Sequence, residues 1–177
     1  KLTAAWPRAE GQIPIYHAHK NTGRPDSSEG TVQHDRPHRS NHIDEESSPQ
    51  FPFGYGLSYA TFEYGELTVE TPELDLRGTL VVSARITNVG QRRGDEIVQL
   101  YVRDLVGSVT RPVKELKGFQ RISLEPGEGK RVRFAVPVRE LGFHGLTMEY
   151  ATEPGEFRVW VGPNSAEGLE SGFWICD

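Results

Sequence analysis

The segment Thr79-Leu-Val-Val-Ser-Ala-Arg-Ile-Thr87 decides the fold class of this chain. Its apolar and polar residues alternate with a period of two, which is the pattern of a β-strand with one buried face. It ends at Asn88-Val89-Gly90, whose asparagine and glycine are typical of turns. We therefore expect a strand over 79–87, followed by a reversal of the chain.

The sequence downstream of this strand repeats the same pattern. Further strands are predicted over 96–102, 113–124, 131–138 and 157–161. Pro126-Gly127 separates two of them and is typical of a type II turn, and a second Pro-Gly pair precedes residue 157. No helix is expected beyond about one turn around 137–142. Short strands separated by turns predict an all-β fold, an antiparallel sandwich of about seven strands.

The composition excludes some functions. The 177 residues carry a formal net charge of −5, which argues against a nucleic-acid partner, because phosphates require a basic surface. No apolar run approaches the roughly 20 residues of a transmembrane helix. Cys176 is the only cysteine, so no disulfide can form within the chain.

The segment 51–62, FPFGYGLSYATF, differs from ordinary strand sequence. It contains five aromatic residues, two glycines and one proline. The glycines permit close backbone approach or positive φ, and Pro52 stiffens the chain around it. A rigid, aromatic segment of this kind is suited to the seam between two domains.

Two zones of different composition precede this segment. Residues 1–25 are expected to form strand and turn, with Pro14 favouring an irregular or edge path. Their few apolar side chains cannot form a core alone, so we expect their partner sheet to lie outside this chain. Residues 26–50 are almost wholly polar and are predicted to be a long loop or linker.

Six segments, in the same order along the chain, carry a resemblance to one enzyme family. They are 7–16 (PRAEGQIPIY), 19–25 (HKNTGRP), 51–62 (FPFGYGLSYATF), 98–102 (VQLYV), 111–119 (RPVKELKGF) and 124–128 (LEPGE). In these segments the chain is similar to the C-terminal region of family 3 glycoside hydrolases, the β-glucosidase and β-xylosidase type, including their fibronectin type III-like domain.

The resemblance implies a division of the chain and of the parent enzyme. Residues 1–25 would end an α/β-sandwich domain as a remnant strand, 26–50 would be a polar crossover linker, and 51–177 would be the fibronectin type III-like domain. The parent would be a retaining β-glycosidase that removes terminal β-D-glucosyl or β-D-xylosyl residues from oligosaccharides. A periplasmic or secreted location is favoured, and no cofactor is implied.

The resemblance also places the catalytic residues outside this chain. The family's nucleophile is an aspartate, commonly in a Ser-Asp-Trp setting on a (β/α)8 barrel, and no tryptophan here follows an aspartate. A barrel needs roughly 250 residues. The acid/base glutamate is expected in the α/β-sandwich domain, upstream of Lys1. The expected partners are therefore these two upstream domains, and the expected role is accessory.

Four residues are candidates for contact with substrate at the rim of the site. They are Lys20, Asn21, Arg24 and Asp44. The first three could reach a sugar hydroxyl, or they could pin the crossover arm to the upstream domains. Asp44 stands where the family often has an aspartate before its PFGYG motif.

Two clusters invite a chemical interpretation that we do not favour. His34, His38 and His42 have the spacing of one helix face and could bind zinc, but Pro37 interrupts the run, so no metal site is expected. Glu45 and Glu46 lack the fixed separation that a glycosidase carboxylate pair requires. We expect them to be solvated.

Trp160 is out of phase with Val159 and Val161, so it is predicted to point away from the core. An outward tryptophan is either an anchor at a domain interface or a platform for a sugar ring. The second option corresponds to an alternative function, an independent carbohydrate-binding or adhesion module. Most of the other strand aromatics are expected in the core: Tyr101, Phe119, Phe134, Tyr150 and Phe157.

Overall fold

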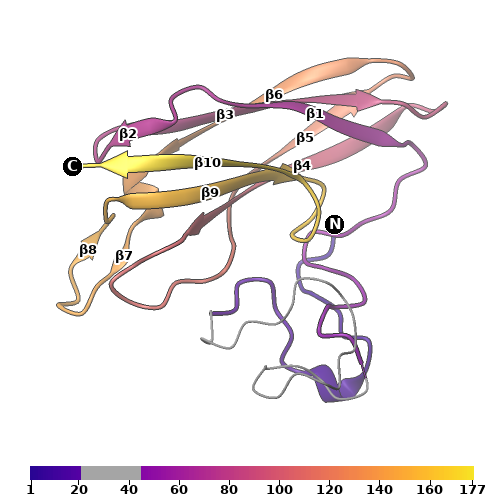
Figure 1. Cartoon of the computed structure of the whole chain (residues 1–177). Coiled ribbons are helices and arrows are strands. Elements are labelled where there is room, and N and C mark those ends of the chain that lie inside the picture. The colour runs from indigo at the N-terminus through magenta and orange to yellow at the C-terminus, as the bar shows by residue number, and fades with distance from the viewer. Residues whose placement is uncertain (21–44) are drawn as a thin grey trace.

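A computed structural model describes residues 1–20 and 45–177 of the chain (Figure 1). Apart from two short 3-10 turns, η1 (Glu10–Gln12) and η2 (Val138–Leu141), the regular structure of these residues is β. The strands are β1 (Phe62–Val69), β2 (Glu73–Asp75), β3 (Thr79–Asn88), β4 (Gly94–Asp104), β5 (Glu115–Leu124), β6 (Gly129–Pro137), β7 (Phe143–His144), β8 (Tyr150–Ala151), β9 (Gly155–Gly162) and β10 (Leu169–Cys176).

Two sheets pack face to face (Figure 1). One has the order β1-β3-β6 and the other the order β2-β10-β9-β4-β5, while β7 and β8 form a separate hairpin. Neighbouring strands are antiparallel except for the short β2, which runs parallel to β10. In the described part of the chain, seven strands have eight or more residues. The predicted antiparallel sandwich of about seven strands is confirmed.

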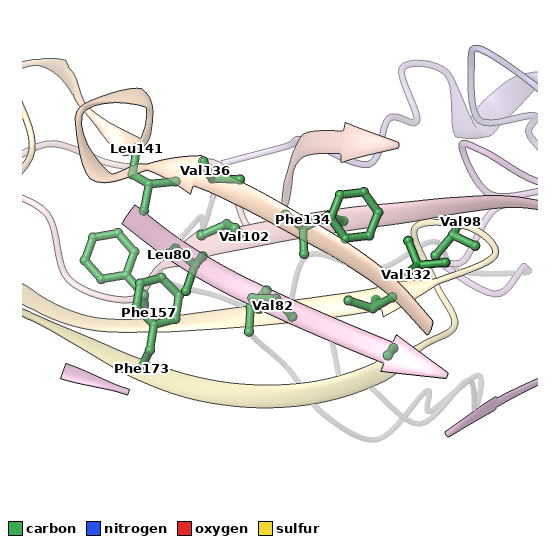
Figure 2. Packing of buried hydrophobic residues seen from close by; sticks show 14 of the residues in the cluster. Leu80, Val82, Val98, Val102, Val132, Phe134, Val136, Leu141, Phe157 and Phe173 are labelled. Atoms are coloured by element: carbon green, nitrogen blue, oxygen red, sulfur yellow. The ribbon is translucent and has the colours of Figure 1, made fainter. Parts of the chain in front are cut away.

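The core lies between the two sheets and is built by the alternation in the sequence. Every second residue of β3, from Leu80 to Ile86, is fully buried. Pairing of β3 with β6 sets Leu80 beside Val136 and Val82 beside Phe134, on the same face. Figure 2 shows these side chains packed with Phe157 of β9. At about 25 cal/mol per Å² of apolar surface removed from water, this burial is the main stabilising term of the sandwich.

The turn predictions also hold. Gly127 adopts a φ of 76° between β5 and β6, and the Glu128 amide donates to the Glu125 carbonyl at 3.0 Å. The Asn88 side chain is buried at the end of β3, where its Nδ2 donates to the Arg92 and Leu124 carbonyls. A buried amide with its hydrogen bonds made holds the turn in place.

Some aromatic residues differ from the prediction. Phe134 and Phe157 lie in the core, whereas Phe119 and Tyr150 are exposed. Phe119 pairs with Gln99 of β4 and shares its side of the sheet, which faces away from the core. Tyr101 is buried but does not belong to the core cluster. An aromatic residue in a strand therefore does not identify the core unless its phase is also known.

Replacing Phe157 by alanine should lower the free energy of unfolding by about 3–5 kcal/mol, because its side chain is 1% exposed and a cavity would remain. The matched control is Phe119→Ala, at a side chain that is 66% exposed, where the change should stay within about 0.5 kcal/mol. Urea unfolding of the two variants measures the difference. Equal losses would contradict the assignment of these two faces.

Candidate functional site at the junction of the arm and the sheet

The described residues before β1, 1–20 and 45–61, form an arm outside the sandwich. Figure 1 shows the arm as a separate lobe beside the loop between β9 and β10. Its two parts pair through the amides of Leu2, Gly54 and Trp6, which donate to the carbonyls of Tyr55, Leu2 and Phe51 at 2.7–2.9 Å. The strand expected within 1–25 is not seen in the described part, 1–20, which makes only isolated bridges, at Trp6 and Lys20. The hydrogen bonds between the two parts of the arm are too few to form a continuous pair of β-strands.

Polar side chains close the arm on itself. Gln12 is buried and accepts from the Arg8 amide, while its Nε2 donates to the Glu46 carbonyl. The Arg8 guanidinium lies 2.9 Å from the Glu46 carboxylate. Glu46 therefore has an ion-pair partner within the arm, where solvation was expected. Because this pair is partly exposed, its contribution is about 1 kcal/mol or less.

The arm is attached to the sheet through Gln99 of β4. This side chain is buried on the outer face, and its Nε2 donates to the carbonyls of Gly54 at 3.1 Å and Pro163 at 2.5 Å. Its Oε1 accepts from the Tyr101 hydroxyl at 2.5 Å. Three elements therefore meet at one amide: the strand, the arm and the β9–β10 loop. A buried amide that lost these partners would retain its full desolvation cost.

The aromatic segment is the part of the arm that packs against the sheet. Phe53 stacks on His17 with ring centroids 4.1 Å apart, and Tyr101 meets both rings edge-on. The Ser165 amide donates to the Phe53 carbonyl at 2.9 Å. The segment therefore packs against the rest of the arm and against the sheet, and its expected place in a seam between two domains stays a prediction.

Trp160 lies on the outer face, beside Tyr101 of β4 and Glu170 of β10. Its indole nitrogen donates to Glu170 at 3.0 Å, and the Lys114 ammonium stands 4.3 Å from its ring centroid. Lys114 also donates to the Ser165 carbonyl at 2.7 Å. Burial lowers the pKa of Lys114 to about 8, against the attraction of Glu170.

A cavity of about 250 Å³ opens where the arm meets the β4–β5 loop and the β9–β10 loop. Its polar lining includes His17, His19 and Lys114. Burial is the first cause of a lowered pKa at His17, followed by the charges of Lys114 and His19. The cavity thus places one ammonium group and two imidazoles around a partly apolar hollow with no carboxylate in its lining, which suits an anion more than a cation.

Of the predicted contact residues, only Lys20 falls within the described part of the chain. It is exposed and forms a bridge to Pro112, while the Val113 amide donates to the His19 carbonyl at 2.9 Å. Asn21, Arg24 and Asp44 lie outside the described residues, as does the histidine triplet 34, 38 and 42. Among residues 1–20 and 45–177, no cluster of three or more His, Cys, Asp or Glu could hold a metal ion.

Sequence reasoning missed Gln99, Lys114 and His17. A signal for Gln99 was present, because a glutamine in the middle of the apolar segment Ile97–Val102 must find hydrogen-bond partners when the strand is buried. Nothing in the sequence pointed to Lys114, whose partners Trp160 and Ser165 are about 50 residues away.

No helix in the described part of the chain combines the length and apolarity needed to cross a membrane.

Comparisons with known proteins agree with this architecture. Residues 96–165 match the family model of the fibronectin type III-like domain. The chain is 42% identical over 173 residues to a periplasmic β-glucosidase of Salmonella typhimurium, an alignment that covers 98% of this chain and 22% of that protein. It is 38% identical over 175 residues to a putative β-xylosidase of Formosa agariphila, covering 99% of this chain and 21% of the relative.

A solved structure shares the whole fold. The β-glucosidase of Listeria innocua in complex with glucose superposes with a TM-score of 0.91 at 35% identity, over 99% of this chain and 24% of that one. The sandwich and the matched model define a fibronectin type III-like module. The chain belongs to the family of these β-glucosidases and β-xylosidases, glycoside hydrolase family 3. It spans about a fifth of the length of the curated relatives given above.

Replacing Gly54 by alanine should detach the arm from the sheet. Gly54 has a φ of 78°, and an added Cβ would overlap the Oε1 atom of Gln99. We expect a loss of about 2–4 kcal/mol and faster hydrogen exchange at the Ser165 amide, which donates to Phe53. Gly11→Ala is the control, since nothing lies within 4 Å of a Cβ there. Unchanged exchange in Gly54→Ala would contradict the proposed attachment.

Proposed function

We propose that this chain is the C-terminal accessory module of a retaining β-glycosidase and that it stabilises the catalytic domains without taking part in the chemistry. Support comes from two relatives, a β-glucosidase and a putative β-xylosidase. Nearly the whole chain aligns with about a fifth of the length of each. In this proposal the parent hydrolyses terminal, non-reducing β-D-glucosyl or β-D-xylosyl residues with two carboxylates that lie upstream of this sequence.

The observation that carries the proposal is the surface of the arm. Tyr59 is 93% exposed and Leu57 is 89% exposed, and Trp6, Ile13 and Tyr16 are also exposed. Large exposed apolar side chains on both parts of the arm are typical of a surface that meets another protein domain. The arm and the sandwich already contact each other through Gln99, so this second surface is available for the upstream domains.

We further propose a domain division that follows this surface. Residues 1–25 would end the upstream α/β-sandwich domain, 26–50 would form the linker, and 51–177 would be the fibronectin type III-like domain. Lys20, Asn21, Arg24 and Asp44 would then lie at the rim of the active site or at the domain interface. The division accounts for an N-terminal segment that has apolar side chains but no sheet in the described part of this chain.

The alternative function, a sugar-binding module, would use Trp160. One face of its ring already holds the Lys114 ammonium, and its nitrogen is hydrogen-bonded to Glu170. A sugar ring that stacked on that face would have to displace a cation–π contact, which is worth about 0.5–2 kcal/mol. The proposal therefore keeps Trp160 as a packing residue of the junction.

The purified chain alone should not hydrolyse an aryl β-glucoside or an aryl β-xyloside, because the proposal places both catalytic carboxylates elsewhere. It should also give no heat on calorimetric titration with cello- or xylo-oligosaccharides. Turnover by the rigorously purified chain would contradict the accessory role. Heat that disappears in Trp160→Ala would favour the alternative module.

Leu57→Ser and Tyr59→Ser should destabilise the full-length parent but not the isolated chain. Burying one such side chain contributes about 1.5–3 kcal/mol, a term that exists only when the upstream domains cover it. Leu146→Ser is the control, because Leu146 is exposed in the β7–β8 hairpin, at the end of the sandwich away from the arm (Figure 1). Scanning calorimetry of both forms gives the comparison, and equal melting temperatures for wild type and variants of the parent would refute the interface.

A further inference from the structure

The cavity at the junction has an unusual balance of charge. Its described lining includes His17, His19 and Lys114 and contains no aspartate or glutamate. These groups come from two elements, since the histidines belong to the arm and Lys114 immediately precedes β5. Lys114 supplies a positive charge and the imidazoles can donate hydrogen bonds, so this lining attracts an anion and opposes the entry of a cation.

The Lys114 ammonium can donate more hydrogen bonds than it makes within the described part of the chain. It can donate three hydrogen bonds, and within the described part of the chain it makes one, to the Ser165 carbonyl. Its other close neighbour is the face of Trp160. The nearby carboxylate of Glu170 is already held by Arg158 at 2.6 Å and by Trp160. Glu170 is also not part of the cavity lining.

His17 and Lys114 are both half-buried, and neighbouring positive charge disfavours the protonated form of each. The charge of Lys114 adds to burial in lowering the pKa of His17, and Arg103 adds to burial in lowering the pKa of Lys114. Glu170 offsets only part of this at Lys114. An anion placed between these groups would relieve both effects at once, because opposite charges at short range stabilise each other in a partly desolvated site.

The size of the cavity and the apolar part of its lining limit the kinds of anion that could bind there. Its volume of about 250 Å³ is just below the range of roughly 300–1,000 Å³ that is typical of small-molecule sites. Ile15, Tyr16 and Val113 supply apolar and aromatic surface beside the cationic groups, and Ser47 supplies a hydroxyl. This combination suits a molecule of monosaccharide size that has an apolar ring face, hydroxyl groups and one acidic group.

We propose that the cavity between the arm, the β4–β5 loop and the β9–β10 loop binds a sugar acid, a monosaccharide that carries a carboxylate. The carboxylate accepts hydrogen bonds from Lys114 and His17, and the ring lies against Tyr16 and Val113. Binding is reversible and involves no covalent step. All the residues that line the cavity belong to the described part of this chain, so its occupancy can be tested independently of the activity proposed for the parent.

The test is an NMR titration of the purified full chain at neutral pH with four probes. These are sodium glucuronate, glucose, sodium acetate and inorganic phosphate, all at one ionic strength. Glucuronate should give saturable shifts at the His17 ring nitrogens and at the Ser165 amide, with acetate weaker and glucose without effect. Phosphate should bind more weakly than glucuronate, because it lacks the ring.

Variants identify the group that holds the carboxylate. Lys114→Met should weaken glucuronate binding about tenfold or more, as expected for loss of a charge-assisted hydrogen bond. Lys114→Arg should retain most of the binding. Lys117→Met is the matched control, because Lys117 lies three residues further along, contacts Glu115 and Glu140, and is not in the lining.

Three results would overturn the proposal. They are no saturable shift with glucuronate, equal binding of glucose, and equal loss in the Lys114 and Lys117 variants. If Lys114→Met fails to fold, as judged by the dispersion of its amide spectrum, Lys114→Arg and His17→Gln take its place, and loss in His17→Gln supports the site. None of these results bears on whether the chain hydrolyses an aryl glycoside.

Discussion

The junction between the arm and the sandwich is centred on one buried amide, the side chain of Gln99. It joins β4 to the arm through Gly54 and to the β9–β10 loop through Pro163, and Tyr101 completes its hydrogen bonding. An amide removed from water is stable only when its donors and acceptor are all used. The arm must therefore bring a carbonyl to this point, and only a glycine at position 54 lets the backbone approach closely enough.

This attachment shapes the surface that the module offers to a neighbour. The aromatic segment 51–62 contacts the sheet through Phe53 and leaves Leu57 and Tyr59 exposed a few residues later. The same attachment forms the cavity that His17 and Lys114 line. His17 stacks on Phe53 in the arm, and Lys114 donates to the Ser165 carbonyl of the β9–β10 loop. The interdomain surface and the proposed ligand site are therefore two consequences of one junction.

The sequence predicted the sandwich well because alternation is a local property. The strand Thr79–Asn88, the turn at Pro126-Gly127 and the short helical turn near 138–141 all follow from residues within one segment. The sequence placed Phe134 and Phe157 correctly but failed for Phe119 and Tyr150. Phe119 was expected in the core and is exposed, because its side follows from its pairing with Gln99, which lies about 20 residues earlier. Of the predicted contact residues, only Lys20 could be placed.

By itself, the sequence determined the all-β class, the positions of most strands and turns, and the likeness to a family of glycosidases. Each of these depends on the order and spacing of residues that are close along the chain. Only the tertiary structure decided that Gln99 anchors the arm, that Trp160 faces Lys114, and that His17 and Lys114 line one cavity. The physical reason is that these contacts join segments up to about 100 residues apart. Their geometry is set by how the arm packs on the sheet, which no local pattern encodes.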